Sequence, residues 1–140
     1  MNSFLILAAI LLSSIVFIAC SFLAIVCGAW LKVGGDFQED NLPQTGFGFR
    51  KIVSLLLSDY LFEFLAPLAI FILLFNLLPL ANVRSAIIFA LIVFTFNASQ
   101  MLLLSLQKIP IPFDFAVFTL FWKLVKYLVS FAVVGFILSI

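Results

Sequence analysis

The sequence predicts an all-α integral membrane protein whose four transmembrane helices form one antiparallel bundle. Of its 140 residues, 66% are hydrophobic and only 9% are charged, and the mean hydropathy is +1.39. A water-soluble domain has too little interior for so much apolar side chain. The longest polar stretch, residues 32–51, is too short to form a separate soluble domain. Residues 1–140 are therefore predicted to form a single transmembrane domain.

Four apolar segments are each long enough to cross the hydrocarbon core of a bilayer, which is about 30 Å thick. The loop at residues 32–51 is rich in glycine and acidic residues and separates the first two. Pro79 and Asn82 end the second segment, and Pro110 and Pro112 separate the third from the fourth. Connections this short make neighbouring helices antiparallel. The helices are predicted at about residues 4–31, 52–80, 85–106 and 113–140.

The basic residues outside the helices predict the orientation of the chain, because Lys and Arg are retained on the cytoplasmic side of a membrane. With alternating crossings, Arg84 falls on one side alone. The opposite side carries Lys32, Arg50, Lys51 and Lys108. We therefore expect a protein of the inner (cytoplasmic) membrane with cytoplasmic loops at residues 32–51 and 107–112 and both termini outside.

Small residues recur at intervals of four along the first helix. Cys20, Ala24 and Gly28 form one such series, and Ala9 and Ser13 form a further pair with a spacing of four closer to the N-terminus. Small side chains let two helix backbones approach closely in lipid. The series predicts a helix-packing face, either against another helix of this chain or against a partner subunit, and it predicts no chemistry.

Each of the other three helices carries a pair of polar residues at broadly similar depth. Spacings of three or four residues place both members of a pair on one helix face. Ionisable side chains at membrane depth are costly and commonly functional, so these residues are the candidate intramembrane polar and charge network. The pairs are Asp59 with Glu63, Asn97 with Gln100, and Lys123 with Lys126.

A buried interhelical network is the interpretation that we favour for these pairs. In it, the carboxylates of the second helix neutralise the two lysines of the fourth helix. The amides of Asn97 and Gln100 supply hydrogen bonds. The charges would then hold the second helix against the fourth and would play an architectural part.

Two other interpretations of the lysines stay open. Trp122 and Tyr127 flank the lysines and favour the headgroup region, so Lys123 and Lys126 can snorkel to the interface. The length of the remaining helix weighs against this interpretation. Only 14 residues follow Lys126, or about 21 Å of helix, which is shorter than the hydrocarbon core that they would have to cross. In the remaining interpretation, the carboxylates and lysines line an ion or proton path.

Recognised catalytic and metal-binding patterns are absent from the sequence. The chain has no His, and it contains no CxxC motif and no phosphate-binding glycine loop with a Lys. We therefore expect no enzyme, no cofactor and no metal site. The formal net charge of +1 gives no electrostatic reason to expect a nucleic-acid partner.

Five short segments occur in this order along the chain: Gly28–Trp30 (GAW), Phe94–Phe96 (FTF), Pro112–Phe115 (PFDF), Phe121–Val125 (FWKLV) and Gly135–Leu138 (GFIL). Together they resemble a family of small four-helix bacterial membrane proteins of unknown function. The resemblance implies a bacterial four-helix fold and no particular activity. Lys123 and Lys126 depart from it, because apolar residues are expected at these positions.

The sequence thus predicts a small polytopic membrane protein that acts as a non-catalytic accessory or structural subunit of a membrane complex. Its expected partners are the lipid bilayer and either another membrane protein or further copies of itself. The alternative function is a small oligomeric ion or solute transporter or channel that uses the intramembrane charged residues.

Overall fold

The structure is a computed structural model that describes residues 3–31, 33, 53–54, 57–77, 83–106 and 112–139, without the side chains of residues 59, 75–77 and 100–106. Every element within these residues is a helix. Apart from Val33 and Pro112, the predicted loops at 32–51 and 107–112 lie outside the described residues. The elements are α1 (Ser3–Leu31), η1 (Asp59–Leu65), α4 (Ala66–Leu77), α5 (Val83–Leu106) and α6 (Phe113–Leu138).

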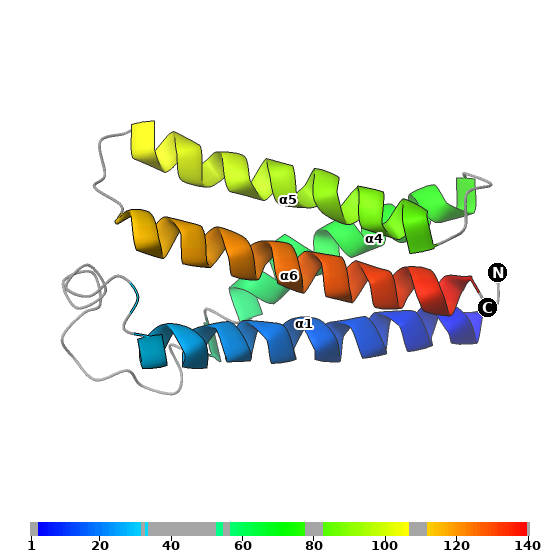
Figure 1. The fold of residues 1–140 in the computed structure, drawn as a ribbon. Helices are drawn as coiled ribbons and strands as arrows, with labels where there is room; N and C mark the ends of the chain where they lie inside the picture. The colour runs from blue at the N-terminus through cyan, green and yellow to red at the C-terminus, as the bar shows by residue number, and fades with distance from the viewer. Residues whose placement is uncertain are drawn as a thin grey trace.

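Helix α6 is the central element of the fold. It packs extensively on both α1 and α5, and it runs antiparallel to both (Figure 1). The η1 segment and α4 follow one another obliquely behind these three helices, where η1 contacts α1 and α4 contacts α5 at a few positions. The N-terminal end of α1 and the C-terminal end of α6 lie at the same end of the bundle (Figure 1).

The second predicted helix differs from expectation, because its middle is a π-helix instead of continuous α-helix. In η1 the hydrogen bonds span five residues, and the backbone N–H of Ala66 donates to the carbonyl of Leu61 at its end. Pro67 follows directly. In an α-helix its ring would clash with the carbonyl of Glu63, and it has no N–H to donate there. The wider π turn accommodates the proline and sets the rotation of the residues before it.

Buried aromatic rings join the helices at the centre of the bundle. The rings of Phe17 in α1 and Phe64 in η1 stack with centroids 4.6 Å apart. Phe131 in α6 contacts Phe64, Phe71 and Phe89 with centroid distances of 5.9, 5.7 and 5.4 Å, so that rings from η1, α4 and α5 meet on one side chain. Offset and edge-on pairs at these distances are favourable.

The face of α1 that packs in the bundle is built largely from small residues. Gly28 is buried, and a Cβ atom at this position would lie 3.2 Å from Cε1 of Phe118 in α6. Cys20 and Ala24, the other members of the predicted series, are half-buried. The buried residues of α1 are Ala9, Ser13, Ser14, Phe17, Ser21 and Gly28.

Large apolar side chains cover the outside of the described part of the chain. Trp30, Phe113 and Phe62 are 85%, 83% and 76% exposed, whereas Lys126 is buried together with four serines. A water-soluble monomer rarely exposes apolar patches of this extent. Two of the described helices, α1 and α6, are long and apolar enough to cross a membrane.

Candidate functional site: a charge cluster between η1 and α6

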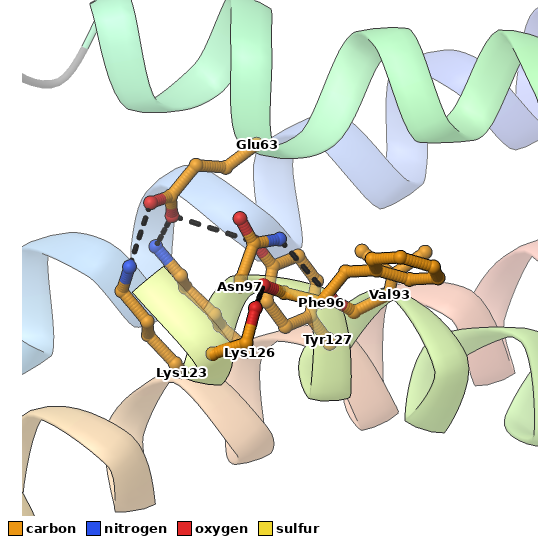
Figure 2. A network of polar contacts seen from close by, with 8 residues as sticks. Glu63, Val93, Phe96, Asn97, Lys123, Lys126 and Tyr127 are labelled. Carbon is orange, nitrogen blue, oxygen red and sulfur yellow. Dashed lines mark hydrogen bonds and ion pairs between the residues drawn. The ribbon is translucent and has the colours of Figure 1, made fainter. Parts of the chain in front are cut away.

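One carboxylate of η1 binds two lysines of α6. The Nζ atom of Lys123 lies 2.8 Å from Oε1 of Glu63, and the Nζ atom of Lys126 lies 3.0 Å from Oε2. Figure 2 shows both lysines reaching from α6 toward the carboxylate on the neighbouring helix. Both oxygens of Glu63 therefore accept charge-assisted hydrogen bonds, which are stronger than neutral ones.

The two lysines differ in how deeply they lie. Their spacing of three residues places both on the face of α6 that meets η1. The side chain of Lys126 is 7% exposed, against 18% for Lys123 and 17% for Glu63. The Lys126 ammonium also lies 4.7 Å from the ring centroid of Phe17, where the π-electrons attract it. Lys126 is thus the inner cation of the cluster and Lys123 the outer one.

A tyrosine and an asparagine continue the cluster to α5. The hydroxyl of Tyr127 donates to Oε2 of Glu63 at 3.4 Å, and Nδ2 of Asn97 donates to the Tyr127 oxygen at 2.9 Å. The same amide nitrogen donates to the carbonyl of Val93 at 3.2 Å. Because Tyr127 is fully buried, its hydroxyl needs such partners. The network therefore joins η1, α6 and α5.

A second polar contact ties η1 to α1. The hydroxyls of Ser14 and Tyr60 lie 2.8 Å apart, and the Ser14 hydroxyl also donates to the carbonyl of Ile10 at 2.5 Å. Tyr60 precedes Glu63 by three residues in the same π segment. This segment is therefore held by hydrogen bonds on two sides, by α1 through Tyr60 and by α6 through Glu63.

The structure brings four of the predicted network residues into one site. Glu63 contacts Lys123 and Lys126 directly, and Asn97 reaches the same carboxylate through Tyr127. The side chains of the two other predicted residues, Asp59 and Gln100, lie outside the described part of the chain. The predicted packing residues Cys20, Ala24 and Gly28 belong to α1 and form no part of the hydrogen-bonded cluster.

Sequence reasoning missed three residues that complete the site. Tyr127 enters the sequence analysis only in the snorkelling interpretation, at a membrane interface, although its position beside Lys126 and its hydroxyl are compatible with the network. Tyr60 shares a helix face with Glu63 by spacing, which is a usable signal. Phe17 carries no signal, because nothing local in α1 indicates that its ring lies over a lysine.

The arrangement stabilises one relative placement of the helices. Opposite charges at these distances attract strongly where water is scarce. Removing one partner of such a pair leaves the other charge uncompensated. Among the described residues, no group of three or more His, Cys, Asp or Glu side chains is arranged to hold a metal ion. The ion pairs that the cluster does form join η1 to α6.

Comparisons of the chain with protein-family models, with curated proteins and with solved structures give no match.

Proposed function

We propose that this chain is a four-span integral membrane protein that serves as a non-catalytic accessory or structural subunit of a membrane complex. The observation that carries the proposal is the engagement of both Glu63 oxygens by Lys123 and Lys126. The charged groups are directed at one another and hold η1 against α6. They leave large apolar side chains as the surface that the described residues present to their surroundings.

The lengths of the helices support four crossings. Helices α1 and α6 have 29 and 26 residues, which correspond to about 43 and 39 Å at the α-helical rise. The 24 residues of α5 correspond to about 36 Å, and η1 with α4 reaches at most about 28 Å. Each length is close to or above the thickness of the hydrocarbon core. The proposed orientation has cytoplasmic loops at 32–51 and 107–112 and both termini outside the inner membrane.

A transport function would require these groups to exchange partners with a moving ion or proton. In the structure, the outer lysine and the inner lysine each bond a different oxygen of one carboxylate, and Tyr127 adds a third donor. Every oxygen of the carboxylate is thus occupied by groups of the chain itself. A static helix-to-helix contact supports an accessory role better than a conducting one.

Purification from native membranes tests the proposal. An affinity tag at Ile140 allows isolation in mild detergent, with the same tag on an unrelated four-span protein as the matched control. We expect one membrane protein to co-purify in a fixed stoichiometry with this chain and not with the control. A homogeneous self-oligomer that moves ions across proteoliposomes would contradict the proposal.

A further inference from the structure

The cluster contains more positive than negative charge among the side chains that the structure describes. Glu63 supplies one carboxylate, whereas Lys123 and Lys126 supply two ammonium groups. One positive charge is left over when all three groups are ionised. An unbalanced charge is costly at membrane depth, so a further anionic group would stabilise the site.

The outer lysine has room for that group. An ammonium carries three donors, and within the described residues Lys123 uses one of them, toward Oε1 of Glu63. Its side chain is 18% exposed, in contrast to the buried Lys126. Figure 2 shows Lys123 at one edge of the network, with Lys126 and Tyr127 farther inside. The opening of the cluster is therefore on the Lys123 side.

The depth of this opening indicates which kind of anionic group can reach it. Lys123 lies ten residues from the start of α6, about 15 Å along the helix and thus near the middle of a 30 Å core. An anionic headgroup belongs at the membrane surface, whereas a carboxylate on a transmembrane helix reaches this depth.

We propose that Lys123 receives an Asp or Glu side chain from an apolar transmembrane helix of the partner subunit. This inference rests on the accessory function proposed above and names the chemistry of the partner. The partner's carboxylate neutralises the remaining positive charge. Charge complementarity at mid-membrane thus makes the docking specific.

A transmembrane peptide tests this docking directly. The full-length chain, with a fluorescent donor fused after Ile140, is reconstituted in lipid vesicles with an acceptor-labelled Leu/Ala helix that carries one central Glu. The comparison peptide has Gln at the same position. We expect energy transfer to show about fivefold tighter association of the Glu peptide. Equal association of the two peptides with the wild-type chain would overturn the proposal without need of any variant.

Three variants test whether Lys123 causes the preference for the Glu peptide. Lys123→Met should abolish the preference for Glu, and Arg84→Gln, a change of an exposed cation on α5, should leave it intact. Asp59→Asn should also leave it intact. A preference that survives Lys123→Met, or one that emerges only in Asp59→Asn, would overturn the proposal. Co-purification of a partner together with equal peptide binding would reject this inference alone and leave the accessory function standing.

Discussion

Helix α6 contacts its neighbours through different chemistry in residues 113–127, which we call its charged half, and in residues 128–138, which we call its aromatic half. In the first half, Lys123, Lys126 and Tyr127 form hydrogen bonds and ion pairs with Glu63. In the second half, the buried ring of Phe131 packs among rings of η1, α4 and α5. Hydrogen bonds need donor and acceptor within about 3 Å, whereas ring pairs are favourable over centroid distances of about 4.5 to 7 Å.

This difference indicates a division of roles along one helix. The charged half tolerates little displacement, so it determines how η1 is rotated and where it lies along α6. The aromatic half tolerates sliding and tilting, so it supplies contact area and cohesion. This division of roles can be tested by changing one half at a time and measuring the free energy of unfolding in mixed micelles.

The largest effect is expected for Glu63→Gln. The substitution keeps the shape of the side chain but leaves two cations without a carboxylate, which should lower the free energy of unfolding by about 3 kcal/mol. A reversible unfolding titration measures the change. The matched control is Glu63→Asp, which keeps the charge and should cost less. A Gln variant as stable as the wild type would show that the charged half contributes no stability.

Phe131→Ala tests the aromatic half. It removes three ring contacts and leaves a cavity, which should cost about 2 kcal/mol. In the membrane setting proposed above, the loss is one of packing and not of transfer from water. Phe136→Ala serves as the control, since Phe136 is 61% exposed. If the two alanine variants unfold at the same denaturant concentration, the ring cluster is not a source of cohesion.

Gly28→Val tests the seam between α1 and the first half of α6. A Cβ atom there already meets Phe118 at 3.2 Å, and the two methyl groups of valine crowd the ring further. We expect a loss of about 1.5 kcal/mol from overpacking. Ala29→Val is the neighbouring control, because Ala29 is exposed. Equal stability of the two valine variants would mean that close approach at Gly28 is not required.

The smallest effect on stability is expected when the whole cluster is replaced. Matched removal of buried charges by apolar or neutral groups is often close to neutral. The triple variant Glu63→Gln, Lys123→Met and Lys126→Met should therefore unfold within about 1 kcal/mol of the wild type. If the triple variant loses as much free energy of unfolding as Glu63→Gln alone, the charged groups stabilise the bundle by more than neutralising one another.

Much of the helical framework can be predicted from the sequence, because helix ends are local. The prolines around residue 111 indicate the start of α6 at Phe113, and the structure begins the helix there. The end of α1 at Leu31 also agrees with prediction. The exception is the second helix, where Pro67 lies in an apolar run. Hydropathy gives no sign that the turns before it are π-helical.

The candidate site is less accessible to sequence reasoning. Spacing alone selects Glu63, Lys123 and Lys126 as members of polar pairs, because helix periodicity places each pair on one face. It does not indicate that Glu63 by itself bonds both lysines. It also does not reveal Tyr127 as a donor to that carboxylate or Phe17 as the ring beside Lys126. These contacts depend on how far each helix is rotated toward its neighbours.

The sequence by itself determined the all-helical class and the places where polar side chains interrupt apolar helices, since both follow from composition and local periodicity. Only the tertiary structure decided that one carboxylate binds both lysines. That choice follows from the π turn before Pro67 and from the crossing of η1 over α6, which together set the direction of Glu63. Distances between helices are properties of packing, and no local pattern contains them.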